Sequence, residues 1–291
     1  MSDGEARFGD PKVLAVEMSK ILDSQDHSDI KFLVGEERKI FFGHKCILSA
    51  RCEVFRAMFA EQSTKHSAAD PYVLSDIKPP IFRALLEFLY TNKCTITADT
   101  SIDVLGAAIE YGLEDMARIC VGYIRDSLSV DNVCEAIQAA LTYCQDDLAR
   151  ECLTLIDGDP DAVFRSRGFT EMSEEALIYI LQSDKLMADE GEILKAVKEW
   201  ATVNSVVSGE SMGDLCKHAI EHVRFPLIDP DELSFIEKEN NRKKYIPIHL
   251  ISHAWKFHAI KEVDRNDIQI RPRAGTLPKE SLRAIGLAAN K

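Results

Sequence analysis

The chain has 291 residues, of which 46% are hydrophobic and 29% charged, and its formal net charge is −13. This composition is ordinary for a globular protein, and the length favours roughly two folded domains of ~150 residues each. Because binding to nucleic acid rewards basic surfaces that displace counterions from phosphates, so acidic a chain is not expected to bind nucleic acid.

The N-terminal sequence MSDGEARFGD has no basic start and no apolar run, so no signal peptide is expected. The longest apolar run, residues 104–109, is far shorter than the ~20 residues that cross a bilayer. We therefore expect a cytoplasmic protein without a membrane partner, and nuclear presence stays open. The eight cysteines form no CxxC pair and mostly lie in helical apolar patterns, which predicts reduced thiols rather than disulfides.

An amphipathic helix is predicted over residues 11–22, directly after a polar stretch, residues 1–11, that is expected to be disordered. Four apolar side chains lie at helical spacing along this helix: Leu14, Met18, Ile21 and Leu22. Because this apolar face lies outside the strand-helix core that follows, we expect it to form an interface.

Short strands and clustered helices come next in the chain. Period-two alternation in SDIKFLV and KIFF, separated by the turn GEER, predicts a hairpin. Gly43 ends the second strand, a short helix begins near His44, and another helix begins near Cys52. Further strands are predicted in YVLSD and CTIT, with the helix PPIFRALLEFLYTN between them and two helices, separated by Gly112, after them. This order of elements predicts an α+β fold for residues 12–128.

The second half of the chain is predicted to be all-helical, because strand signals nearly vanish after Ser129. Two antiparallel helix pairs are expected, one over VDNVCEAIQAALTYC and DDLARECLTLI, the other over SEEALIYILQS and DEGEILKAVKEWATV. The last of these helices starts with the capping-box spacing of Asp189 and Glu192. This domain is expected to span residues 129–260. Residues 261–291 carry seven basic and four acidic residues and little apolar content, which predicts a basic, weakly structured tail.

Several separated motifs of the first half resemble a BTB/POZ domain, in the order in which that family carries them. They are SDIKFLVG, FFGHKCILSARCEVFRAMF, VLSDIKPPIFRALLEFLYT and AAIEYGLEDMARIC. The motifs LQSDKL, VKEW and HVRFPLIDPDEL of the second half resemble a BACK domain. The resemblance implies a BTB/POZ domain, with a small sheet and clustered helices, followed by an all-α BACK domain.

By resemblance to BTB/POZ domains, the first half forms a homodimer. The family places an acidic residue at the start of the first strand and a basic residue after the histidine near the dimer axis, here Asp29 and Lys45. A charged pair among apolar neighbours is costly to bury unless the two charges compensate each other, and a solvated lysine at a helix start is an equal alternative. The predicted dimer interface joins the helix face to this turn: Leu14, Met18, Ile21, Leu22, Asp29, His44 and Lys45.

Related BTB-BACK proteins are adaptors that join a substrate protein to a cullin-3 RING ubiquitin ligase. The resemblance implies a cullin-contact surface on the helix EVFRAMFAEQ: Phe55, Met58, Phe59, Glu61 and Gln62. Many cullin-binding members carry a hydrophobic-x-Glu triplet shortly after this motif, where this chain has Gln62, Ser63 and Thr64. The triplet Phe59-Ala60-Glu61 has the right composition but lies three residues early, which on a helix rotates it by about 300°.

The missing triplet leaves two non-enzymatic functions open. The chain is either an adaptor, with itself, cullin-3 and an unknown substrate protein as partners, or a structural scaffold for oligomerisation without a ligase role. The two differ in whether cullin co-purifies with the intact chain.

A metal-dependent enzyme is the weakest alternative. Histidines at i, i+4 spacing form the main metal-like pattern: His218 and His222, then His249 and His253, with Cys216 and His258 nearby. Such pairs can bind zinc, but no glutamate follows the first histidine as in HExxH, and a closed site needs four ligands. The sequence has no GxSxG motif and no Gly-rich phosphate loop, so we expect no metal, no cofactor and no catalysis.

Overall fold

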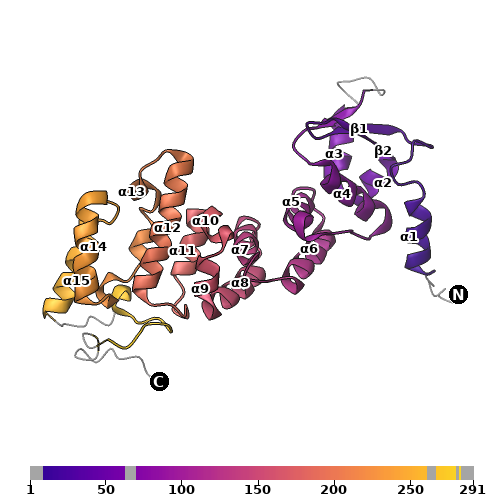
Figure 1. Cartoon of the computed structure of the whole chain (residues 1–291). Helices are drawn as coiled ribbons and strands as arrows, with labels where there is room; N and C mark the ends of the chain where they lie inside the picture. The colour runs from indigo at the N-terminus through magenta and orange to yellow at the C-terminus, as the bar shows by residue number, and fades with distance from the viewer. Residues whose placement is uncertain (1–8, 63–69, 261–266, 280–281, 283–291) are drawn as a thin grey trace. The chain divides into compact units, whose positions relative to one another are not determined.

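The computed structural model describes residues 9–62, 70–260, 267–279 and 282. The chain divides into two compact units, Met1–Ser127 and Leu128–Lys291. The sequence placed the domain boundary after residue 128. Figure 1 shows the elements of both units.

The N-terminal unit contains a three-stranded sheet with the order β2-β1-β3. Strands β1 (Ile30–Val34) and β2 (Lys39–Gly43) are the antiparallel hairpin that the alternating pattern predicts, and Ile30 lies opposite Gly43. Strand β3 (Tyr72–Leu74) runs parallel to β1 on its other side. The sheet therefore needs a crossover between β2 and β3, and two helices lie within the described residues of that connection.

Helices cover this sheet and complete the unit. Their bounds are α1 (Pro11–Ser19), α2 (Lys45–Arg51), α3 (Glu53–Gln62), α4 (Pro79–Thr91), α5 (Ser101–Glu110) and α6 (Glu114–Asp126), with a 3-10 turn η1 (Ala98–Thr100) before α5. Helix α4 begins with two prolines and ends at Asn92, whose left-handed φ of 56° closes the last turn. Gly112, with φ of 66°, allows the sharp reversal between α5 and α6.

Four phenylalanine rings form the centre of the N-terminal core. Phe32 of β1, Phe41 of β2, Phe55 of α3 and Phe82 of α4 are all buried. The ring of Phe82 lies 5.1 Å from that of Phe32 and 5.3 Å from that of Phe41, in tilted or edge-to-face geometry. Aromatic pairs prefer such angles, and each ring also removes a large apolar area from water.

The strand predicted in CTIT, residues 94–97, is absent from the described structure, so this prediction was wrong. The backbone there bonds to a side chain instead of a neighbouring strand. Glu87 of α4 accepts hydrogen bonds from the Thr95 amide at 3.1 Å and from the Thr95 hydroxyl at 3.0 Å. A carboxylate thus takes the place of a sheet ladder as the partner of this backbone.

The C-terminal unit contains only helices and turns within its described residues, which together with the sheet unit confirms the α+β class. Its α-helices are α7 (Val133–Thr142), α8 (Asp146–Gly158), α9 (Pro160–Phe164), α10 (Arg167–Glu171), α11 (Glu174–Leu181), α12 (Glu190–Ser208), α13 (Met212–Leu215), α14 (Pro230–Lys243) and α15 (Ile248–Ile260). Its 3-10 turns are η2 (Ala219–His222), η3 (Phe225–Leu227) and η4 (Ile268–Ile270).

Two sequence predictions for this unit meet different outcomes. Helices α7 and α8 pack on each other as expected, and α12 starts with the capping box of Asp189 and Glu192. The second predicted pair differs, because α12 packs mainly on α10 and α13 rather than on α11. These neighbours, α10 and α13, are helices of only four or five residues, which a pattern of longer helices does not indicate.

The prediction of a weakly structured tail was wrong for its described part. Residues 267–279 and Leu282 lie on the C-terminal unit, and we call them the docked segment. Its basic side chains Arg273 and Lys279 are buried, since each pairs with a buried acid of the unit. At the other end of the chain, residues 1–8 lie outside the described residues, whereas Asp10 is ordered and caps α1.

Candidate functional site

Helix α1 presents part of the apolar surface that the sequence predicts, because the helix ends at Ser19 and the half-buried Ile21 and Leu22 follow it in a turn. The helix buries none of its residues, and Leu14 and Val16 are 60% and 62% exposed. A groove of about 980 Å³ lies between α1, α2 and α4. Its lining brings together three of the predicted interface residues and apolar side chains of α2 and α4: Leu14, Met18, Leu22, Ile47 and Leu89. An apolar face and groove of this kind are typical of a surface that a partner covers.

Asp29 and Lys45 meet within one chain, but through the backbone. The Asp29 carboxylate accepts a hydrogen bond from the Lys45 amide at 2.7 Å, which satisfies a free N–H of the first turn of α2. The Lys45 ammonium instead lies 5.9 Å from the centre of the Phe59 ring. Between these two described residues there is no side-chain ion pair within the chain, and Asp29 is exposed.

Changing Asp29 to alanine is therefore expected to lower the free energy of unfolding by about 1 kcal/mol, the usual cost of losing a helix-capping acceptor. Urea denaturation at constant protein concentration measures this loss. Asp29→Asn keeps an oxygen acceptor and serves as the control, with most of the stability retained. A loss of about 3 kcal/mol or more would instead indicate a buried ion pair with Lys45 at a dimer axis.

The structure places His44 inside the chain rather than on a surface. Tyr90 of α4 accepts a hydrogen bond from the His44 amide at 2.9 Å and lies 2.8 Å from the His44 Nδ1. The His44 Nε2 is 3.3 Å from the Asp26 carbonyl oxygen. Burial raises the pKa of Tyr90 to about 12, so its hydroxyl stays protonated. His44 therefore links the start of α2 to the end of α4 through Tyr90, and its buried side chain does not face a partner.

The surface proposed for cullin contact is smaller than the sequence implied. Phe55 is wholly buried in the core, so its assignment to a surface was wrong. Phe59 is half-buried and stacks on Phe55 at 5.8 Å, and Met58 beside it is half-buried too. Glu61 is exposed and Gln62 is the last residue of α3. Ser63 and Thr64, where the triplet would be completed, lie outside the described residues.

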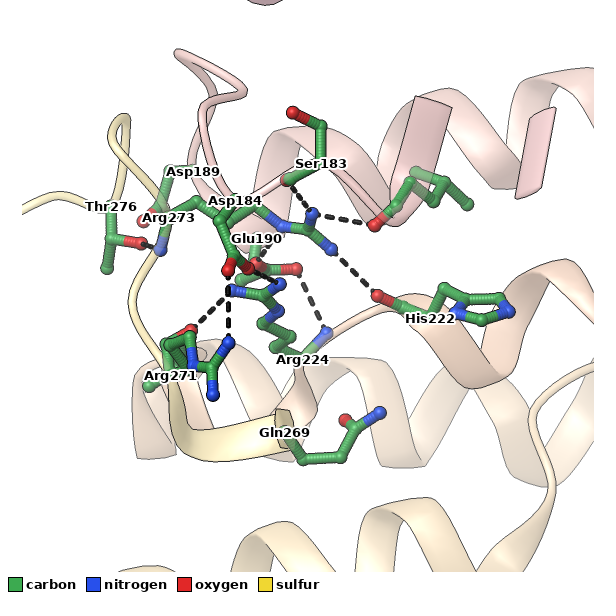
Figure 2. A network of polar contacts seen from close by, with 12 residues as sticks. Ser183, Asp184, Asp189, Glu190, His222, Arg224, Gln269, Arg271, Arg273 and Thr276 are labelled. Atoms are coloured by element: carbon green, nitrogen blue, oxygen red, sulfur yellow. Dashed lines mark hydrogen bonds and ion pairs between the residues drawn. The ribbon is translucent and has the colours of Figure 1, made fainter. Parts of the chain in front are cut away.

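A buried charged cluster in the C-terminal unit was not anticipated from the sequence. Figure 2 shows Arg273 of the docked segment against Glu190, the first residue of α12. The Arg273 Nε lies 2.7 Å from a Glu190 oxygen, and both side chains are 0% exposed. The two terminal nitrogens of the Arg273 guanidinium donate to the carbonyl oxygens of Leu181, Ser183 and His222 at 2.5 to 2.8 Å. The ion pair and these hydrogen bonds compensate the buried charge of Arg273, whose burial would otherwise be costly.

The other charges around this pair are also compensated. The second Glu190 oxygen accepts a hydrogen bond from the Arg224 amide at 2.9 Å, and the Arg224 guanidinium pairs with Asp184. Burial acts to raise the pKa of Asp184, but hydrogen bonds from Arg224 and Arg271 outweigh it and lower that pKa. Burial lowers the pKa of Arg273, and the charge of Glu190 opposes this shift. The cluster is thus a set of ion pairs rather than an exposed charged surface.

A second anchor lies next to the first. The Lys279 ammonium is 2.8 Å from an Asp189 oxygen and 2.8 Å from the Leu227 carbonyl oxygen. The other Asp189 oxygen accepts from the Leu277 amide at 3.1 Å. Asp189 therefore caps α12 and holds the docked segment with the same carboxylate. The only sequence signal for this was the capping box, which indicated the helix start but not its distant partner.

Two histidines of the zinc hypothesis have other partners for their side chains. His253 Nε2 lies 3.1 Å from the Asp267 carboxylate, and His258 Nε2 lies 2.9 Å from the Ile228 carbonyl oxygen. Across the residues that the structure describes, no group of three or more His, Cys, Asp or Glu side chains is arranged to hold a metal ion. Nor does any helix within those residues have the length and apolar content to cross a membrane.

Comparison with known proteins agrees with this architecture. Residues 18–128 match the BTB/POZ domain family, and residues 133–237 match the BACK family, BTB And C-terminal Kelch. BTB/POZ domain-containing protein 19 of Bos taurus is 39% identical over 280 residues, which cover 96% of this chain and 96% of that protein. The chain belongs to the BTB/POZ-BACK family. The resemblance stated from the sequence motifs is thereby confirmed.

Other relatives of this BTB/POZ-BACK protein share its arrangement to different extents. BTB/POZ domain-containing protein 19 of Homo sapiens is 38% identical over 281 residues, with 96% of each chain covered. BTB/POZ domain-containing protein 9 of Drosophila melanogaster is 29% identical over 244 residues, which cover 80% of this chain and 33% of that protein. The two families are protein-interaction domains and neither is a catalytic family; BTB domains typically homodimerise, and BTB-BACK proteins often serve as cullin-3 substrate adaptors.

Proposed function

We propose that this BTB/POZ-BACK protein is a non-enzymatic adaptor that homodimerises through its BTB domain and brings a substrate protein to a cullin-3 RING ubiquitin ligase. The observation that carries the proposal is the apolar face of α1 beside the groove against α2 and α4, which one chain leaves open. Family membership supports the adaptor role. The proposal includes no cofactor, and it places the protein in the cytoplasm.

The dimer is proposed to form on the α1 groove. Val13, Leu14 and Val16 are exposed on a helix that buries none of its own residues, so a second copy of the chain gives them the cover they lack. Lys45, whose amide donates to Asp29, is the first residue of α2, which also lines the groove. We expect an interface that buries on the order of 2,000 Å² or more, as stable homodimers do. Light scattering at micromolar concentration tests this, and a stable monomer mass would overturn it.

Binding to the cullin is proposed to use the end of α3. There Met58 and Phe59 are half-buried beside the exposed Glu61, so the accessible apolar area is small. The chain has Gln62, Ser63 and Thr64 in place of the hydrophobic-x-Glu triplet, and thus lacks its central apolar anchor. Loss of one such anchor commonly costs about 2 kcal/mol, or roughly thirtyfold in affinity.

We therefore expect this protein to bind the N-terminal domain of the cullin weakly, with a dissociation constant on the order of micromolar. Restoring the triplet with the double change Gln62→Met and Thr64→Glu should strengthen binding by roughly thirtyfold. Calorimetric titration of both proteins measures the difference. Nanomolar affinity of the unchanged protein, or no gain in the variant, would show that this helix end does not govern binding.

The second candidate function is a structural scaffold that dimerises but binds no cullin. The missing triplet is the observation that favours it. Affinity capture of the intact chain from cells separates the two functions, since an adaptor co-purifies with the cullin and a scaffold does not. Both functions require the same BTB dimer, so the light-scattering test applies to either one.

A further inference from the structure

The docked segment contacts the C-terminal unit as a peptide contacts its receptor. It is mostly non-helical between Arg271 and Lys279, and it turns at Arg273, where the Thr276 hydroxyl accepts from the Arg273 amide at 2.8 Å. At this turn the backbone also bonds to the helical body. The Ala274 amide donates to the Asp184 carbonyl at 2.9 Å, and the Gly275 amide donates to the Leu186 carbonyl at 3.0 Å. Backbone pairing of this kind gives affinity to peptide-binding sites in general.

Three side chains of the segment are buried against the helical body. Arg273 contacts Glu190 and three carbonyl oxygens, and Lys279 contacts Asp189 and the Leu227 carbonyl oxygen. Leu282 is buried in a small apolar cluster with Leu227 and Phe257, to which Ile270 of the same segment also belongs. The acceptors for both cations come from residues 181–227, in the helical body.

Gly275 makes the site selective for one spacing of residues. A Cβ atom at this position would lie 2.1 Å from the Ala188 nitrogen and 2.2 Å from the Met187 carbonyl carbon. Both neighbours are backbone atoms, so no side-chain rotation relieves the clash. A ligand must therefore have glycine two residues after its arginine, and its lysine lies four residues after that glycine, as in the sequence RAGTLPK.

We propose that the BACK unit carries a receptor site for a basic, non-helical peptide with the pattern Arg-x-Gly-Thr-x-x-Lys. The docked segment is its resident ligand, and a partner protein with the same pattern competes for the site. One carboxylate oxygen and three carbonyl oxygens accept from the planar guanidinium of Arg273, while the Asp189 carboxylate suits the compact ammonium of Lys279. The proposal does not depend on cullin binding, since it concerns contacts within the C-terminal unit alone.

The test uses a fluorescent peptide of residues 267–282 and three full-length proteins: the unchanged chain, Gly275→Ala and Gly158→Ala. Gly275→Ala should expel the resident segment, whereas Gly158→Ala is the matched control because a Cβ there meets no atom within 4 Å. We expect the peptide to bind Gly275→Ala at least about tenfold more tightly than the other two, whose sites are occupied. Fluorescence anisotropy measures these affinities.

Two altered peptides define the recognition. Peptides with Arg273→Ala or Gly275→Ala should bind the Gly275→Ala protein about tenfold more weakly or worse, because each loses an anchor or clashes with the backbone near Ala188. If the protein keeps its helical circular dichroism but binds no peptide, the segment is an inseparable part of the domain and the proposal is overturned. Equal binding of all three peptides would overturn it as well.

A measurement on the unchanged chain covers the case in which Gly275→Ala does not fold. Amide hydrogen exchange distinguishes local opening from global unfolding, and a resident ligand should leave its site without unfolding of the receptor. The amides of Ala274, Gly275 and Leu277 should then exchange faster than those in the middle of α12. Exchange of these three amides at the same rate as the interior of α12 would show that only global unfolding frees the segment, and would overturn the proposal.

Discussion

Replacing Arg273 by alanine is expected to lower the free energy of unfolding of the C-terminal unit by about 3–5 kcal/mol, the cost of breaking a buried ion pair by removing one partner. Both side chains of the Arg273–Glu190 pair are fully buried, and no other side-chain cation lies on the same Glu190 oxygen among the described ion pairs. The variant would leave a carboxylate without its partner charge and three carbonyl oxygens without their donor. The loss is limited by the free energy with which the docked segment holds its site, because water reaches Glu190 once the segment leaves.

Urea denaturation followed by tryptophan fluorescence measures this loss selectively, because both tryptophans, Trp200 and Trp255, belong to the C-terminal unit. Arg165→Ala is the matched control. Arg165 pairs with Asp161 on the surface and its side chain is 79% exposed, so its removal should cost no more than about 0.5 kcal/mol. The double change Arg273→Met with Glu190→Gln should be milder than Arg273→Ala, since no unpaired charge stays buried. Equal stability of Arg273→Ala and the control would contradict the buried pair.

Changing Leu14 to aspartate is expected to convert the proposed dimer to monomers. Burying one leucine side chain contributes about 1.5–3 kcal/mol, and a two-fold interface contains the position twice. The loss of roughly 3–6 kcal/mol weakens dimerisation by about two to four orders of magnitude. Leu14 is 60% exposed within one chain, so the change should leave the fold of the BTB unit intact.

Light scattering and sedimentation over a range of concentrations measure the shift, and circular dichroism checks the fold. Val207→Asp is the control, because Val207 is an apolar residue that is 81% exposed near the end of α12, in the other unit. It should leave the dimer unchanged. A Leu14→Asp protein that stays dimeric at micromolar concentration would show that α1 is not the dimer surface.

Much of the fold could be predicted because its signals are local. Alternation identified the hairpin of β1 and β2, and helical periodicity identified α4 with its buried face. The capping box at Asp189 and Glu192 marked the start of α12, since a cap needs only residues that are three apart. These features depend on a few consecutive residues, and a sequence pattern contains all of them.

The docked segment could not be predicted, because its partners are distant in sequence. Arg273 pairs with Glu190, which lies 83 residues earlier in the chain. In the sequence alone, both residues look like ordinary solvent-exposed charges. Two site residues were misplaced for a related reason. The pattern around Phe55 and His44 indicates a helix and a turn, but only the packing against α4 shows that both side chains face inward.

The position of Lys279 and Leu282 after α15 has a consequence for biosynthesis. The acidic start of α12 leaves the ribosome 83 to 90 residues before Arg273 and Lys279, the cations that neutralise it. During translation, Asp189 and Glu190 must therefore stay hydrated until Arg273 and Lys279 have emerged. A premature stop codon after α15 would release a product in which these carboxylates lack their partner cations and the apolar neighbours of Leu282 are uncovered. Incompletely packed domains of this kind expose apolar surface to chaperones and proteases, so quality control would recognise such a truncation even though helices α7 to α15 had been synthesised.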